Sequence, residues 1–199
     1  MSCTGTLIAP DRVLTAAHCI LDPATREIVP LERIHFLTGV FGSRYTAHAL
    51  PKCVVLADDL KKRASPPERR PPPVRGLARF ANDFAILVLD KPLATPPIPV
   101  VAAYSATTPG PLLHAAYAGD RRQRLTADRG CRLRATKDGL WLTDCDTHYA
   151  GSGGPVLVEQ AGAIRLAAVM VGVLSGQATV AVPAARWAHV ARSAACRAR

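Results

Sequence analysis

The sequence predicts an all-β protein that ends in one α-helix, and two observations support this fold class. First, Gly, Pro, Asn and Asp divide the 199 residues into short apolar runs rich in Val, Leu and Ile. Apolar runs of this length between turn residues are typical of strands in a sandwich or barrel. Second, helical spacing of apolar residues is confined to the end of the chain.

The predicted strands follow one another with short connections. They are CTGTLIA (3–9), RVLTAA (12–17), RIHFLTGVF (33–41), CVVLA (53–57), FAILVL (84–89), LLHAAYA (112–118), GLWLTDC (139–145), GPVLVE (154–159), IRLAAVMVGVL (164–174) and ATVAV (178–182). The helix is predicted over 184–196, because Pro183 suits a first turn and apolar residues then recur every three or four positions. The face expected to dock on the β core consists of Trp187, Val190, Ala191 and Ala194.

Two segments lack a strand pattern. Residues 61–76 are rich in Pro and Arg without an apolar period, which predicts an exposed loop. Residues 93–111 are rich in Pro, Thr and Ala and divide the apolar runs about equally, which predicts a linker. We therefore expect an N-terminal β half over 1–100 and a C-terminal half, including the helix, over 101–199.

Charge and hydropathy exclude two classes of partner. The chain carries 25 Lys and Arg against 15 Asp and Glu, a net charge of +10. Its densest basic runs, at 61–75 and 120–124, contain no aromatic residue, whereas nucleic-acid sites usually interleave the two. No apolar run approaches the roughly 18 residues of a spanning helix. We expect neither nucleic-acid binding nor a membrane span.

Six cysteines indicate disulfides in an oxidising compartment, because their number is even and no C-x-x-C pair is present. The protein should therefore be secreted or periplasmic, with no metal or cofactor. Several connectivities are possible. Short loops of roughly 15 residues, each worth about 3 kcal/mol, favour two pairs and leave the third by elimination. These pairs are Cys3–Cys19, Cys131–Cys145 and Cys53–Cys196.

Three residues could form a nucleophilic site. Ser152 lies among small residues in YAGSGGP (149–155), which allow a sharp turn but are also common in surface loops. A nucleophilic serine needs a base and an orienting acid. His18 follows an apolar run, and Asp83 precedes another, where a carboxylate must be hydrogen-bonded to stay charged. A lone histidine is usually structural or solvated, but the neighbours of His18 count for more here, whereas Asp83 taken alone could equally be a turn or strand-start residue.

Together these residues lie in segments that resemble the active-site segments of the trypsin-like (chymotrypsin-fold) serine proteases. The segments are CTGTLIAPDRVLTAAHC, NDFAILVLDKPL and CDTHYAGSGGPV, in the family's order, followed by MVGVLSG (170–176). The nearest resemblance is to bacterial secreted members and the glutamyl-endopeptidase branch. It implies two antiparallel six-stranded Greek-key β-barrels and a C-terminal helix, with the active site in the cleft between the barrels.

The resemblance implies a serine endopeptidase with polypeptide substrates, expected to be a monomer. Ser152 would be the nucleophile, His18 the base and Asp83 the residue that orients His18. The backbone N–H groups of Ala150 and Ser152 would form the oxyanion hole. Ala150 replaces the family's usual glycine, which costs little at negative φ and about 1–2 kcal/mol at positive φ. Gly151 replaces the acid that trypsin uses in zymogen activation, so that switch is not expected.

The sequence leaves the cleavage specificity open. Asp146, six residues before Ser152, matches the acid that selects Arg or Lys in trypsin, but the glutamyl-endopeptidase branch also has Asp there. Ser175 and Gly176 resemble the strand that lines the pocket and pairs with the substrate. We interpret His148 as a solvated loop histidine and not as a residue at the pocket entrance. The alternative function is a weak or inactive protease-fold homologue that binds peptides.

The first predicted strand, over 3–9, matches the family's second strand. We therefore expect a first barrel that lacks its N-terminal strand and carries an unpaired edge. A signal peptide and one or two strands would then lie upstream of the sequence.

Overall fold

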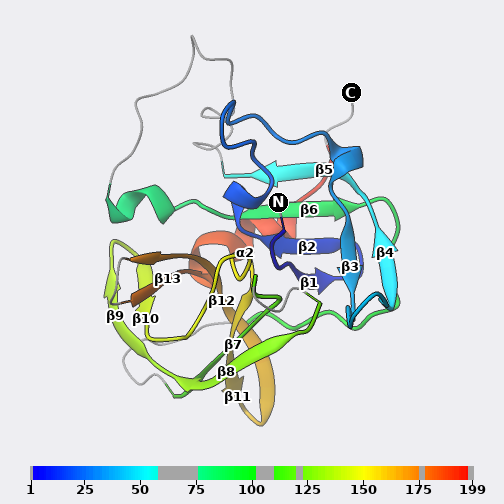
Figure 1. The fold of residues 1–199 in the computed structure, drawn as a ribbon. Helices are drawn as coiled ribbons and strands as arrows, with labels where there is room; N and C mark the ends of the chain where they lie inside the picture. The colour runs from blue at the N-terminus through cyan, green and yellow to red at the C-terminus, as the bar shows by residue number, and fades with distance from the viewer. Residues whose placement is uncertain (1, 58–75, 102–109, 120–122, 175–177, 197–199) are drawn as a thin grey trace.

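The computed structural model describes residues 2–57, 76–101, 110–119, 123–174 and 178–196 (Figure 1). All but the last residue of the predicted loop 61–76 lies outside these ranges, as do Ser175 and Gly176. In Figure 1, strands β1 to β6 gather on one side of the molecule and strands β7 to β13 on the other. The predicted all-β class with one C-terminal helix is confirmed.

The N-terminal strands form a four-stranded antiparallel sheet, in the order β1-β2-β6-β5, and a separate β3-β4 hairpin. Their bounds are β1 (Thr6–Ala9), β2 (Arg12–Thr15), β3 (Phe36–Thr38), β4 (Ala47–Ala49), β5 (Pro51–Leu56) and β6 (Ala85–Leu89). Three short 3₁₀ segments are η1 (Ala17–Cys19), η2 (Leu31–Arg33) and η4 (Leu77–Phe80). Every residue of β6 is buried, because this strand lies between β2 and β5, and this accounts for its continuous apolar sequence.

The edge of β1 is partly covered. The sequence predicts an unpaired edge there, but the Ile98 N–H donates to the Leu7 carbonyl at 2.8 Å. Two residues further on, Val100 forms a parallel bridge to Leu166 in the other sheet. The described part of the predicted linker is therefore bonded to both sheets.

The C-terminal strands form one seven-stranded antiparallel sheet, in the order β8-β7-β11-β12-β13-β10-β9. Their bounds are β7 (Leu112–Ala116), β8 (Thr126–Cys131), β9 (Leu133–Lys137), β10 (Leu140–Thr143), β11 (Pro155–Gln160), β12 (Ala163–Leu174) and β13 (Ala178–Pro183). Strands β4, β8 and β9 were not predicted. Strands β8 and β9 lie at the two edges of this sheet, and half of the residues of β8 and most of those of β9 are exposed, so they lack the apolar pattern that marks a buried strand.

The helix α2 (Ala184–Ser193) begins after Pro183, as predicted. Trp187 on its inner face is fully buried, and its indole N–H donates to the Val182 carbonyl at 3.0 Å. The predicted apolar face therefore docks on the core. Among the described residues, no helix combines the length and hydropathy needed to span a bilayer.

The helix ends three residues before the predicted position. Ala194 adopts an extended conformation, and its carbonyl accepts two hydrogen bonds from the Arg12 guanidinium at 3.0 and 3.1 Å. Cys196 is in turn bonded to Cys53 in β5. These contacts pull residues 194–196 toward the first sheet and out of helical geometry.

Three disulfides crosslink the chain, with the pairings that loop length and elimination favoured. Cys3–Cys19 and Cys131–Cys145 close short loops within one half each. Cys53–Cys196 instead spans 143 positions and joins the last described residue to the first sheet.

We predict that the double variant Cys53→Ala/Cys196→Ala loses more stability than Cys3→Ala/Cys19→Ala. Loop-closure entropy gives about 5 kcal/mol for the long loop and about 3 kcal/mol for the short one. Urea unfolding followed by circular dichroism measures both losses. Equal losses, or a larger loss in the short-loop variant, would contradict this account.

Candidate active site

Two neighbouring strands bring His18 and Asp83 together. In the β2–β6 pair, Thr15 lies opposite Ala85, so the end of β2 meets the beginning of β6. His18 follows β2 in η1, and Asp83 directly precedes β6. One Asp83 oxygen lies 2.7 Å from His18 Nδ1, and the other accepts the His18 backbone N–H at 2.9 Å. The carboxylate therefore holds both the main chain and the ring of His18.

The electrostatic balance at His18 favours its charged form. Burial alone would lower the pKa of the imidazole, and the nearby Arg26 charge also lowers it. The hydrogen bond to Asp83 and the carboxylate charge outweigh both effects, so the His18 pKa lies above its usual 6.5. Because Nδ1–H is donated to Asp83, Nε2 is the nitrogen left to accept a proton.

The loop that carries Ser152 is held by backbone hydrogen bonds on both flanks. The Gly151 N–H donates to His148 O at 2.9 Å, and the Gly154 N–H donates to Gly151 O at 3.0 Å. The Gly153 N–H donates to Met170 O at 2.7 Å, which ties the loop to β12. Ser152 therefore stands on a shaped turn and not on a loose loop.

Gly153 is a position where only glycine fits. Its φ is 82°, in the left-handed region, and a Cβ there would overlap the Thr4 carbonyl oxygen and the Thr15 hydroxyl. The Thr4 N–H donates to Ser152 O at 2.9 Å, and the Thr15 hydroxyl donates to Thr4 O at 2.8 Å. The N-terminal segment thus packs directly on the serine loop.

Ser152, His18 and Asp83 line one open cleft of about 420 Å³. Its other lining residues are Ala17, Leu21, Arg26, Arg79, Phe80, Val171, Gly172 and Val173. Among the described residues, Ser152 Oγ has no hydrogen-bond partner. Catalytic hydrogen bonds are often long before substrate binds, so this geometry agrees with a nucleophile that is not yet engaged.

The two backbone donors expected to form an oxyanion hole are free of partners within the described ranges. These are the N–H groups of Ala150 and Ser152. Ala150 has a φ of 68°, so this alanine adopts the glycine-like conformation. The Thr4 hydroxyl donates to the Ala150 carbonyl at 3.2 Å and thereby helps to hold this peptide in place. The conformation costs about 1–2 kcal/mol relative to glycine.

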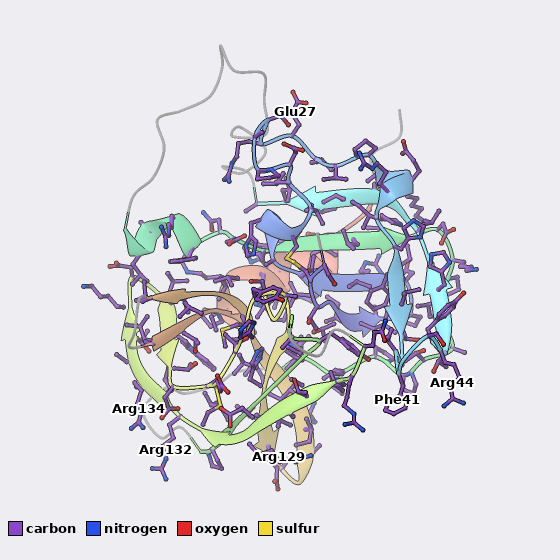
Figure 2. All side chains as sticks on the ribbon, viewed as in Figure 1. Glu27, Phe41, Arg44, Arg129, Arg132 and Arg134 are labelled. Atoms are coloured by element: carbon purple, nitrogen blue, oxygen red, sulfur yellow. A yellow bond between two sulfur atoms is a disulfide. The ribbon has the colours of Figure 1, made fainter. Side chains whose placement is uncertain are left out.

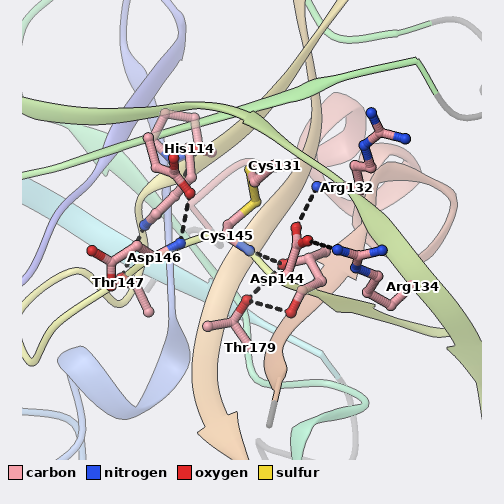
Figure 3. Close-up of a disulfide and its surroundings, with 12 residues drawn as sticks. His114, Cys131, Arg132, Arg134, Asp144, Cys145, Asp146, Thr147 and Thr179 are labelled. Carbon is pink, nitrogen blue, oxygen red and sulfur yellow. Dashed lines mark hydrogen bonds and ion pairs between the residues drawn. A yellow bond between two sulfur atoms is a disulfide. The ribbon is translucent and has the colours of Figure 1, made fainter.

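Sequence reasoning missed His114, which lies beneath the serine loop (Figure 3). This buried imidazole donates Nδ1–H to Pro155 O at 3.0 Å, and its Nε2 accepts the Thr147 hydroxyl at 3.0 Å. Burial lowers the His114 pKa, so the ring is neutral, as an accepting Nε2 requires. Thr147 and Pro155 flank Ser152. The only sequence signal was a histidine inside the apolar run 112–118.

Asp146 does not lie in the cleft with Ser152. It is exposed, and its backbone N–H donates to the Asp128 carboxylate at 2.7 Å (Figure 3). His148 is also exposed, with its ring 4.5 Å from that of Tyr149. The other two predicted substrate-binding residues, Ser175 and Gly176, lie outside the described ranges.

Two clusters bring potential metal ligands together, but both depend on cysteines. One consists of Cys3, Cys19 and His18, and the other of Cys131, Cys145 and Asp128. In each cluster the two sulfur atoms are joined in a disulfide. Thiolate ligation is therefore blocked, and one conventional ligand remains in each cluster.

A family model described as a trypsin-like peptidase domain matches residues 3–164. The chain belongs to the trypsin-like peptidase family. It is 30% identical over 168 residues to human serine protease 23, covering 79% of this chain and 43% of that protein. It is 33% identical over 87 residues to cercarial protease of Schistosoma mansoni, covering 44% and 30% respectively. The chain thus spans less than half the length of these curated relatives.

The fold is similar to that of a solved structure of Glu endopeptidase in complex with MPD. The TM-score is 0.68 at 21% sequence identity, covering 94% of this chain and 81% of the other. This likeness supports the chymotrypsin-like double β-barrel expected from the sequence.

We predict that the His18 ring titrates above pH 6.5, and that Asp83→Asn brings its pKa below 6.5. The substitution removes the carboxylate charge but leaves the burial and the Arg26 charge, both of which lower the pKa. Chemical shifts of the His18 ring protons followed by NMR measure this. The raised His18 pKa also makes stability depend on pH. The His18–Asp83 pair stabilises the fold fully below about pH 6.5, and this contribution is lost as the pH rises through the folded-state pKa of His18. An unchanged pKa in Asp83→Asn would contradict the assignment.

We predict that Ala150→Gly stabilises the fold by up to about 1 kcal/mol, because relief of left-handed strain exceeds the added unfolded-state entropy. Ala161→Gly is the matched control, since Ala161 also has a positive φ of 52° but lies in the β11–β12 turn. Both variants should be stabilised, and only Ala150→Gly should change the reactivity of Ser152. Thermal unfolding measures the first effect. Destabilisation of Ala150→Gly alone would show that alanine is preferred there.

Proposed function

We propose that the protein is a serine endopeptidase that cleaves peptide bonds through an acyl-enzyme, with Ser152, His18 and Asp83 as catalytic residues. The observation that carries the proposal is the pair of hydrogen bonds that His18 donates to the two Asp83 oxygens, in a cleft that Ser152 also lines. Membership of the trypsin-like peptidase family supports the same class of reaction.

In the first step, Ser152 Oγ attacks the carbonyl carbon of the scissile bond while His18 Nε2 takes the hydroxyl proton. Asp83 keeps the ring in the tautomer with hydrogen on Nδ1 and stabilises the cation that forms. The negative charge develops on the former carbonyl oxygen. The free N–H groups of Ala150 and Ser152 are available to donate to it, and each such donor is worth about 2.7–4 kcal/mol.

Collapse of the tetrahedral intermediate breaks the C–N bond. His18 returns its proton to the leaving amine, and an ester with Ser152 remains. Water then attacks the ester, His18 takes the proton from that water, and a second collapse releases the new carboxyl terminus and restores the serine hydroxyl. Each step uses the same Nε2 atom, which is why the tautomer held by Asp83 matters throughout.

The setting proposed for this activity follows from the crosslinks. Three disulfides with no free cysteine among the described residues favour a secreted or periplasmic protein. We assign the two catalytic halves to 1–100 and 101–199, acting on polypeptides as a monomer. Ser175 and Gly176 remain proposed substrate-binding residues. The exposed position of Asp146 gives no support for selection of basic residues.

A second candidate function is peptide binding without cleavage. It is favoured by the strained Ala150 in the proposed oxyanion hole. It is also favoured by the Ser152 hydroxyl, which forms no hydrogen bond to His18 among the described residues. The two candidates differ in whether Ser152 reacts.

We predict that a fluorophosphonate probe labels Ser152 covalently and that Ser152→Ala abolishes labelling. Ser193→Ala is the matched control, because that serine is exposed on α2 and donates only to helix carbonyls. Intact-mass spectrometry and peptide mapping measure the adduct. Unchanged labelling of Ser152→Ala would refute the assignment, and a folded wild-type protein without any adduct would favour the binding function.

A further inference from the structure

The chain approaches the serine loop through three successive residues that are fixed to neighbouring strands (Figure 3). Cys145 is joined to β8 by a disulfide, and the Asp146 N–H donates to the Asp128 carboxylate on the same strand at 2.7 Å. The Thr147 hydroxyl then donates to Nε2 of His114, on β7, at 3.0 Å. The start of the serine loop is therefore held to the sheet residue by residue.

The His114 ring joins this start to the end of the same loop. Its Nδ1 lies 3.0 Å from the carbonyl oxygen of Pro155, the first residue of β11. A carbonyl can only accept, so Nδ1 carries the hydrogen and Nε2 accepts from Thr147. The imidazole is 2% exposed, so water competes little for either nitrogen. One buried side chain thus links residues 147 and 155.

The same two side chains pack against glycines on both sides of Ser152. A Cβ added at Gly151 would lie 2.3 Å from Thr147 Oγ1, and one added at Gly154 would lie 2.9 Å from His114 Cε1. The two side chains therefore form a floor directly beneath the serine turn. Among the described residues, neither of them lines the cleft.

This floor depends on a neutral ring. Burial lowers the pKa of His114 and outweighs the bond to Pro155 and the charges of Asp128 and Asp146, all of which raise it. A charged ring would carry hydrogen on Nε2 as well and could not accept the Thr147 hydroxyl.

We propose that His114 is a positioning residue of the endopeptidase: by holding Thr147 and Pro155, it sets the turn from which the Ala150 and Ser152 N–H groups donate to the oxyanion. This role rests on the proposed function. A displacement of about 1 Å in a positioned group can cost about 100-fold in rate. The donors act mainly in the transition state, so their misplacement should lower kcat and leave KM almost unchanged.

The test compares Thr147→Val, which keeps the shape of the side chain but removes the hydroxyl, with Thr147→Ser, which keeps the hydroxyl. The substrates are individual fluorogenic peptides that the wild type cleaves, chosen to differ in the side chains beside the cleaved bond. Thr147→Val should reduce kcat about 10- to 100-fold for every peptide, with little change in KM. Thr147→Ser should restore most of the lost kcat, because the bond to His114 can form again.

His114→Asn tests the same bond from its other partner. The Asn amide can still donate to the Pro155 carbonyl, but this shorter side chain does not reach Thr147. The double variant with Thr147→Val should lose no more kcat than the single variants, because all of them lack one bond. Fully multiplicative losses would contradict the role. If His114→Asn does not fold, the Thr147 variants alone decide.

Thr38→Val is the matched control. Thr38 is a buried threonine of β3 whose hydroxyl lies 3.0 Å from the Thr95 hydroxyl, and it does not line the cleft. It belongs to the β3–β4 hairpin, where Figure 2 labels Phe41 and Arg44. Thr38→Val should lower the melting temperature without changing kcat.

Two results would overturn the positioning role. One is a wild-type kcat in folded Thr147→Val. The other is a loss confined to peptides with one class of side chain, which would show that Thr147 binds the substrate directly. Fluorophosphonate labelling separates both from failure of the proposed function. Wild type that is labelled at Ser152 keeps that function, whereas folded wild type without labelling refutes it and, with it, the role of His114.

Discussion

The close packing of the Gly153 backbone against Thr4 and Thr15 is the constraint on which the rest of the site depends. No side chain fits there, and the backbone must be left-handed. Because a Cβ at Gly153 would overlap Thr4 and Thr15, the N-terminal segment and the serine loop can pack this closely only with glycine at that position. His18 follows Thr15 by three residues, so its distance from Ser152 is set by the same contact. The close approach of these two segments thus depends on the absence of a Cβ at Gly153.

Left-handed backbone is distributed unevenly among the residues that are not glycine. The described chain has four such residues, of which Asp138 and Ala161 lie in hairpin turns that require the conformation. The other two, Arg26 and Ala150, lie beside the cleft. Strain of this kind persists only where surrounding contacts hold it, and it tends to gather at functional sites. Here Asp22 supports one residue and Thr4 the other.

Burial decided what could be predicted from the sequence. Strand β6 was predictable because it is buried throughout, whereas β9 was not, because its exposed residues need no apolar pattern. His18 and Asp83 were predictable because each adjoins an apolar strand. Their pairing depends on strand register, which no single residue encodes, and was inferred from the family resemblance.

Backbone conformation and long-range packing set the remaining limits. The φ of Ala150 depends on contacts with Thr4, which lies far away in the sequence. The cost of alanine at this position could therefore be stated from the sequence for negative and for positive φ, but not which of the two applies. His114 resembled any other core histidine until its partners Thr147 and Pro155 were known. Asp146 matched by counting, but a count carries no information about whether a side chain is exposed or lines a pocket.

The bond between Thr4 and Ser152 also has a consequence in time. Residues near the first described strand must pack against a loop that a ribosome adds only after most of the chain has been made. Until then, the N-terminal segment lacks its packing partner, and Cys53 cannot pair with Cys196, which is made later still. A growing chain therefore cannot assemble this site until most of its residues have been synthesised.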